Sequence, residues 1–210
     1  MRNIFFAEFF GTFALVLVGT GVVAHNMVGL VGAALTFGLI VAGMIYLLDD
    51  ISGAQINPAV TFALALNGLL KWKDVFIYWA AQFLGGVAAS AVLFFMMGNA
   101  KSGLGATVLS SGVSPLQGVV TEAVATFFLM MAVFFLVDAK VGKRAGLLMA
   151  PTIVFVVLLA APLTGAGLNP ARSLGPALFT GTLSIFWVYL VGPVAGAALA
   201  VPIYRLVKKG

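Results

Sequence analysis

The sequence has no cysteine, a single histidine and few charged residues. Lysine, arginine, aspartate and glutamate make up 8% of the 210 residues, whereas soluble domains carry about one quarter. The lack of cysteine excludes disulfides and thiolate chemistry, and one histidine gives no basis for a His/Cys metal site. One histidine and six acidic residues also offer no evident pairing of a base with a nucleophile. We therefore expect no enzymatic activity, no metal and no other cofactor.

What the chain has in abundance is apolar side chains. Hydrophobic residues make up 62% of it, a composition typical of integral membrane proteins, whose partner is the lipid bilayer. The formal net charge of +5 could suggest binding to nucleic acid. The basic residues are not gathered on one surface, however, so we expect no nucleic-acid partner.

Six apolar segments are long enough to cross a bilayer, which takes about 20 residues. They are residues 4–23, 29–48, 75–97, 116–137, 145–163 and 183–204. The first segment follows Arg2 and resembles a signal peptide. It contains Glu8, however, and has a twin later in the chain, which favours a retained membrane span.

A phrase of nine residues occurs twice between these segments. Residues 52–60 read Ser-Gly-Ala-Gln-Ile-Asn-Pro-Ala-Val, and residues 164–172 read Thr-Gly-Ala-Gly-Leu-Asn-Pro-Ala-Arg. Each phrase is followed by an apolar stretch of about ten to fourteen residues, which is too short to span a bilayer and is typical of re-entrant segments. Such a matched pair of short, Gly/Pro-interrupted segments indicates a site at the middle of the membrane.

The two Asn-Pro-Ala motifs predict the start of two short helices. Asn57 and Asn169 are suited to cap a helix N-terminus, and Pro58 and Pro170 are suited to the first helical position. The motifs are completed by Ala59 and Ala171. Each Asn can use its carboxamide oxygen for capping and keep its NH2 donors free to face a lumen. Because helix N-termini carry about half a positive charge each, two facing ends would make the centre of a pore positive.

The two halves of the sequence repeat one another. Ala-Glu-Phe-Phe-Gly-Thr-Phe around Glu8 matches Thr-Glu-Ala-Val-Ala-Thr-Phe around Glu122, and Tyr78 matches Tyr189. Each half holds three spans and one half-span, and because three is odd the copies must be inverted in the membrane. We expect an all-α membrane protein with six transmembrane helices and two re-entrant half-helices. It would form one transmembrane channel domain, residues 1–210, with inverted repeats 1–98 and 115–210 and a polar linker, 99–114.

The distribution of basic residues predicts the orientation. With both termini in the cytoplasm, nine basic residues fall on the cytoplasmic side, Lys101 falls outside and Arg172 lies inside the membrane. The nine are Arg2, Lys71, Lys73, Lys140, Lys143, Arg144, Arg205, Lys208 and Lys209. Short termini and compact loops favour the inner (plasma) membrane of a bacterium or archaeon. Glycines such as Gly85, Gly86, Gly192 and Gly196 suit close helix crossings.

Together, the duplicated Asn-Pro-Ala motif, the matched glutamates and the six-span plan resemble the aquaporin, or major intrinsic protein, family over the whole chain. The resemblance implies a passive channel for water or small neutral solutes, with one pore per subunit of a homotetramer. It also implies a narrow selectivity region formed by Phe37, Val157, Ala166 and Arg172. Strict water channels usually have histidine at the position of Val157, and the set of four is most similar to nodulin-like members. Ser173 and Ala177, after the second motif, resemble the residues of water-type members.

Valine and alanine at two wall positions predict a wider and more apolar opening, while Arg172 still offers fixed donors. We therefore expect passage of water and of small uncharged solutes. The alternative is a facilitator of glycerol or metalloid acids with water as a secondary permeant. Ions and protons would be excluded, because Asn57 and Asn169 would both donate to one water and the facing helix ends would repel cations.

Glu8 and Glu122 are acidic residues inside membrane spans, which often indicate function. One interpretation is a proton relay, and the other is a structural role, in which they accept hydrogen bonds from the loops before the half-helices. A coupled transporter shares inverted repeats but would need an ionisable site near the midplane. A junctional role without transport is the third class, although the outer loops are short.

Overall fold

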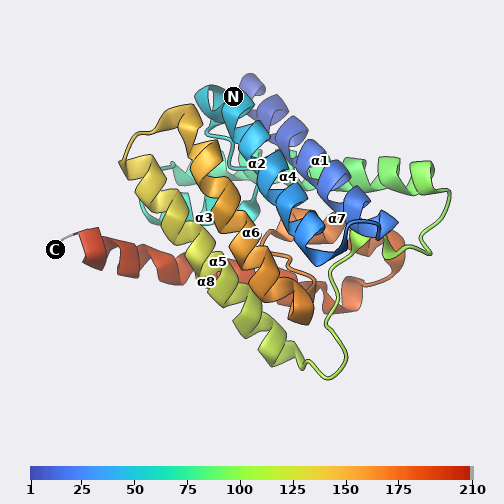
Figure 1. Cartoon of the computed structure of the whole chain (residues 1–210). Helices are drawn as coiled ribbons and strands as arrows, with labels where there is room; N and C mark the ends of the chain where they lie inside the picture. Colours follow the sequence, from blue (N-terminus) through green and yellow to red (C-terminus); the bar gives the residue numbers. More distant parts are fainter. Residues whose placement is uncertain (209–210) are drawn as a thin grey trace.

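The computed structural model describes residues 1–208, in which all long segments are helical (Figure 1). Lys209, one of the basic residues assigned above to the cytoplasmic side, lies outside the described residues. The α-helices are α1 (Arg2–His25), α2 (Gly29–Ser52), α3 (Pro58–Leu66), α4 (Trp72–Met97), α5 (Pro115–Asp138), α6 (Ala145–Thr164), α7 (Pro170–Thr180) and α8 (Phe186–Lys208). Three short 3₁₀ helices complete the described elements: η1 (Gly103–Gly105), η2 (Gly142–Arg144) and η3 (Leu183–Ile185).

Six of these helices are long and apolar enough to cross a membrane, which confirms the predicted spans. Their surfaces carry large exposed apolar side chains, among them Phe76, Phe95 and Leu147, which are 72%, 86% and 76% exposed. Side chains of this kind are stable against lipid, so the chain is a multi-pass membrane protein. Several helix ends differ from the predicted ones by a few residues, because a helix continues past the apolar stretch that marks the hydrocarbon layer.

The two Asn-Pro-Ala motifs start the two short helices, as predicted. Helix α3 has 9 residues and α7 has 11, and each has proline at its first position and asparagine at its N-cap. At 1.5 Å per residue neither can cross a bilayer alone. Figure 1 shows both short helices surrounded by the long ones, with α2, α5 and α6 crossing in front.

Helix packing follows the sequence repeat, since the main helix pairs of the first half have counterparts in the second. Helices α1 and α4 pack together as α5 and α8 do, and α1 with α2 as α5 with α6. Each half-helix packs against a long helix of the other half, α7 on α4 and α3 on α8. The halves are therefore interlocked around a shared core that draws residues from both.

Glycines occupy the closest helix crossings. A Cβ on Gly86 would lie 2.5 Å from the carbonyl oxygen of Ala171, and one on Gly192 would lie 2.9 Å from that of Val119. Gly85 and Gly196 likewise face the backbones of α1 and α5. Because real Cβ atoms do not approach backbone atoms this closely, the sequence needs glycine there, as small residues at membrane helix contacts predict.

Polar contacts gather at the end of the bundle where α2, α3, α5 and α8 finish. Lys143 pairs with Asp50 at 2.7 Å, and Lys208 pairs with Asp138. Arg205 donates to the Asn67 side chain at 2.8 Å, next to the last turn of α3. We refer to this end as the basic end.

The linker, residues 99–114, is more than a polar boundary. Its ends are exposed, but Leu104 is fully buried against α1, α4 and α7. Gly103, Leu104 and Gly105 all have left-handed backbones, with φ of 73°, 47° and 64°. The linker therefore folds back into the bundle at the end opposite the basic end.

Candidate functional site

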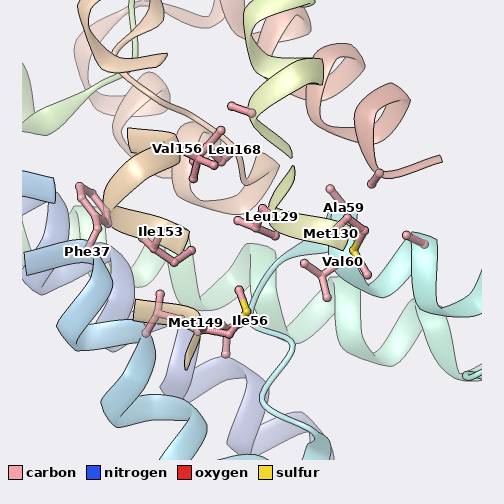
Figure 2. Packing of buried hydrophobic residues seen from close by; sticks show 14 of the residues in the cluster. Phe37, Ile56, Ala59, Val60, Leu129, Met130, Met149, Ile153, Val156 and Leu168 are labelled. Atoms are coloured by element: carbon pink, nitrogen blue, oxygen red, sulfur yellow. The ribbon is translucent and has the colours of Figure 1, made fainter. Parts of the chain in front are cut away.

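A cavity of about 590 Å³ runs from the basic end into the centre of the bundle. Its walls are mainly apolar side chains of α2, α5 and α6 and of the loops before α3 and α7, several of which are labelled in Figure 2. The polar residues on its wall are Asp49, Ser52, Gln55, Asn57, Tyr78, Lys140, Asn169 and Arg172. Half of these residues belong to the two short-helix loops or to the first turn of α7, namely Gln55, Asn57, Asn169 and Arg172, so polar groups are concentrated around the short-helix starts.

Both loops hold their backbones in an unusual conformation. Ala54 and Ile56 have φ of 45° and 43°, and their counterparts Ala166 and Leu168 have 53° and 56°. Left-handed backbone costs about 1–2 kcal/mol per residue for amino acids with a side chain. The loops therefore need strong contacts elsewhere to keep this shape.

Glu8 supplies those contacts in the first loop. Its carboxylate accepts hydrogen bonds from the backbone N–H groups of Gln55 at 2.9 Å and Ile56 at 2.6 Å. The side chains of Ser52 and Gln82 donate to the same carboxylate. Glu8 is fully buried, and both of its oxygens are occupied by donors from the loop and its surroundings.

Glu122 makes the matching contacts in the second loop. It accepts from the N–H groups of Gly167 at 2.8 Å and Leu168 at 2.6 Å, and from the hydroxyl of Thr164 at 2.6 Å. Tyr189 reaches the same region and donates to the Thr164 carbonyl, as Tyr78 does to that of Ser52. The repeat within the sequence pairs these two tyrosines but does not indicate what they bind.

Asn57 and Asn169 cap the short helices and also connect the two halves. Their carboxamide oxygens accept from the N–H groups of Ala59 and Ala171, at 2.9 and 3.0 Å. The NH2 groups, which we expected to be free for a lumen, each donate across to the other loop. Asn57 donates to the carbonyl oxygen of Leu168 at 2.9 Å, and Asn169 donates to that of Ile56 at 2.8 Å. The expectation of wholly free NH2 groups was therefore wrong, since one N–H of each group is used in these bonds and only the other remains for the cavity.

Farther along the cavity, Phe37, Val157, Ala166 and Arg172 all lie on its wall. The guanidinium carbon of Arg172 lies 5.3 Å from the centre of the Phe37 ring. Val157 and Ala166 add two apolar side chains, each 5% exposed. The structure thus brings together all four residues named from the sequence, which come from α2, α6, the second loop and α7.

Arg172 is held by a residue that sequence reasoning missed. Its Nη1 donates to the carbonyl oxygen of Gly105 in the linker at 2.8 Å, while its Nε atom has no protein partner among the described residues. The sequence shows only that Leu104 stands between two glycines in a segment rich in Gly and Ser. No periodic pattern marks such a contact, because it depends on a loop that folds back.

The comparisons with known proteins agree with this geometry. The family model described as major intrinsic protein matches residues 1–204. "Aquaporin NIP1-1" of Zea mays is 40% identical over 209 residues, which cover 96% of this chain and 73% of the relative. "Aquaporin NIP1-1" of Arabidopsis thaliana is 39% identical over 214 residues, with 96% and 72% covered.

Among solved structures, the X-ray structure of the aquaglyceroporin from Plasmodium falciparum superposes with a TM-score of 0.89. It covers 100% of this chain and 99% of its own at 24% sequence identity, so it is similar in fold. The all-α fold with six long helices and two short ones is therefore that of an aquaporin. The chain belongs to the major intrinsic protein family, whose members are membrane channels and not enzymes.

Proposed function

We propose that this channel of the major intrinsic protein family conducts water together with small uncharged solutes. The observation that carries the proposal is the set of four residues at the far end of the cavity. Val157 and Ala166 offer no hydrogen bonds from their side chains, while Arg172 offers fixed donors opposite the apolar Phe37 ring. An opening with one polar corner and apolar walls suits slim, neutral molecules that carry hydroxyl groups.

A second candidate, a facilitator of glycerol or metalloid acids with water as a secondary permeant, has the same apolar walls in its favour. The names of the relatives leave the order of preference open, since NIP aquaporins and an aquaglyceroporin are both similar to this chain. We place water first because the second motif continues with Ser173 and Ala177. These two residues resemble those found at the same place in the water-type members of the family.

We further propose that Asn57, Asn169 and Arg172 exclude protons and ions. The remaining N–H donors of the two asparagines would bind the oxygen of a passing water and orient its hydrogens away from each other. The positive ends of α3 and α7 meet at this point and repel cations. Glu8 and Glu122 would support the loops instead of relaying protons, since the bonds to the loops occupy oxygens on both carboxylates.

For the membrane arrangement, we propose one channel domain of two inverted repeats with both termini in the cytoplasm of a plasma membrane. The ion pairs and basic residues at the basic end support this orientation, because positive charge is retained inside. Lys101 lies in the linker at the opposite end. A homotetramer is expected from the family.

The test is light scattering from proteoliposomes that contain the purified channel. An impermeant osmolyte reports water efflux, and a glycerol gradient reports glycerol entry as reswelling. We expect water flow far above that of protein-free vesicles and a slower but measurable glycerol flow. Neither flow should change when an ion or proton gradient is imposed, since a coupled transporter would respond to it. Water flow no faster than in empty vesicles would overturn the proposal.

A further inference from the structure

We propose that Gly19 and Thr20 of α1 set the spacing between Phe37 and Arg172, and so determine which neutral solutes pass. This inference rests on the proposed function, because it takes these two side chains as the walls of the selective opening. Neither Gly19 nor Thr20 is on the wall of the cavity. They would act as positioning residues, by contacting the groups that hold Phe37 and Arg172 on the cavity wall.

Gly19 lies directly behind the Phe37 ring. A Cβ added at Gly19 would lie 2.7 Å from both Cδ1 and Cζ of that ring, and nearer still to Cε1. Three atoms of the Phe37 ring therefore pack directly against the backbone of α1 at Gly19. A protein interior at this density has no room for the extra carbon without displacement.

On its other side, the Phe37 ring faces the cavity. Phe37 is 8% exposed and lies on the cavity wall, with the Arg172 guanidinium on that side. A methyl group at position 19 would therefore push the ring away from α1 and toward Arg172. The width of the opening thus depends on the absence of a side chain at Gly19.

Thr20 lies behind Arg172 in a similar way, with the linker between them. A Cβ on Gly105 would lie 2.6 Å from the carbonyl oxygen of Thr20 and 2.8 Å from its Cα and Cβ. The Thr20 hydroxyl donates a hydrogen bond to the carbonyl oxygen of Val16 in its own helix, which fixes the side chain. Because residue 105 is glycine, the linker can lie close to α1 and its carbonyl oxygen can reach Arg172 at 2.8 Å.

Two neighbouring residues of one helix therefore support both walls. Buried Leu104 anchors the linker at this place, so the Gly105 carbonyl is not free to follow Arg172 if the side chain moves. A change at Gly19 moves Phe37, and a change at Gly105 moves the acceptor of Arg172. The two effects on the opening have opposite signs.

The first experiment is Gly19→Ala, with Gly21→Ala as its matched control. A Cβ at Gly21, on the same helix, would meet only Leu93 at 3.5 Å, an ordinary contact. In the proteoliposome assay we expect Gly19→Ala to lower the glycerol-to-water ratio about tenfold, equivalent to about 1.4 kcal/mol. Gly21→Ala should keep the wild-type ratio. Equal ratios in the two variants would overturn the proposal.

A second background separates positioning from damage to the fold. In Phe37→Ala there is no ring to displace, so adding Gly19→Ala should leave the ratio of that variant unchanged. If the double variant loses water flow as well, Gly19 is needed only for folding and the proposal fails. Phe37→Ala alone must change the ratio; if it does not, the proposed constriction itself is wrong, whatever Gly19→Ala does.

The other wall is tested by Gly105→Ala, with Gly103→Ala as its control. Both glycines have a left-handed backbone, with φ of 64° and 73°, but a Cβ at Gly103 meets nothing within 4 Å. The pair therefore separates backbone strain from contact with Thr20. We expect Gly105→Ala, but not Gly103→Ala, to weaken the hydrogen bond from Arg172 to the carbonyl oxygen of residue 105 and to raise the glycerol-to-water ratio. A rise of the same size in Gly103→Ala would overturn the role of Thr20.

Discussion

Asn57 donates a hydrogen bond to the carbonyl oxygen of Leu168, at 2.9 Å and 111 residues away in the sequence. Asn169 makes the reciprocal bond to Ile56. The two loops are thus joined where the positive ends of α3 and α7 meet. The remaining amide N–H groups are oriented by these bonds, which favours donation to a molecule in the passage.

The first prediction concerns this pair of bonds. Asn57→Asp replaces the NH2 donor by a carboxylate oxygen, which cannot donate to the Leu168 carbonyl and adds a negative charge. We expect slower water flow and a measurable proton leak, because the local positive potential falls. A pH-sensitive dye inside proteoliposomes under a pH gradient measures the leak.

Asn67→Asp serves as the control for that variant. Asn67 lies just after α3 and accepts a hydrogen bond from Arg205, which a carboxylate can also accept. Proton flux in this control should match the unchanged channel. If the Asn57→Asp channel shows no proton leak, proton exclusion does not depend on the asparagine donors.

The second prediction concerns Val157. In Val157→His the imidazole fills space and adds a donor, so we expect the glycerol-to-water ratio to fall while water flow persists. Val157→Leu adds bulk without a donor and separates size from polarity. If the histidine variant keeps the original ratio in the light-scattering assay, Val157 does not line the selective opening.

The third prediction concerns the buried glutamates. In Glu122→Gln only one oxygen remains as an acceptor, so the N–H of Gly167 or Leu168 loses its partner. An unsatisfied buried N–H costs about 1–3 kcal/mol. We expect a lower melting temperature in detergent and reduced water flow per channel.

Asp74→Asn is the matched control, because Asp74 is only half-buried and makes no ion pair among residues 1–208. Its melting temperature should be close to that of the unchanged protein. If Glu122→Gln is equally stable, the carboxylate does not support the loop. A proton-relay role would then deserve a direct test by proton flux.

The fourth prediction follows from the absence of cysteine. Mercurial reagents should leave water flow unchanged, because no thiol is present to react. Val157→Cys should make the channel sensitive to them. Leu39→Cys, at a position on α2 that is 67% exposed on the outer surface of the bundle, should not. Block of both cysteine variants would show that the reagent acts elsewhere than in the passage.

Much of the fold could be predicted from the sequence because it depends on local signals. Apolar length predicted the six spans, and the Asn-Pro pairs predicted the starts of α3 and α7, since capping and proline geometry are local properties. Exact helix ends were less certain. Trp72, for instance, begins α4 before the apolar stretch does.

In the candidate site, the two asparagines and the two glutamates could be singled out from the sequence repeat, whereas the four residues of the selectivity region needed the resemblance. Phe37 and Val157 are ordinary apolar residues in a chain with eighteen phenylalanines, and no pattern distinguishes them. The Gly105–Arg172 bond and the crossed asparagine bonds join residues far apart in sequence. Contacts of this kind depend on how loops fold back, which composition and periodicity do not encode.

The crossed bonds also bear on the order in which the protein can form. During synthesis at the ribosome the first three membrane spans emerge long before residue 169 does. Until then the carbonyl of Ile56 lacks its donor and Asn57 lacks its acceptor. The loop before α3 is therefore synthesised before its partners in the second half exist. It can adopt its final hydrogen bonding only after the loop before α7 has been translated.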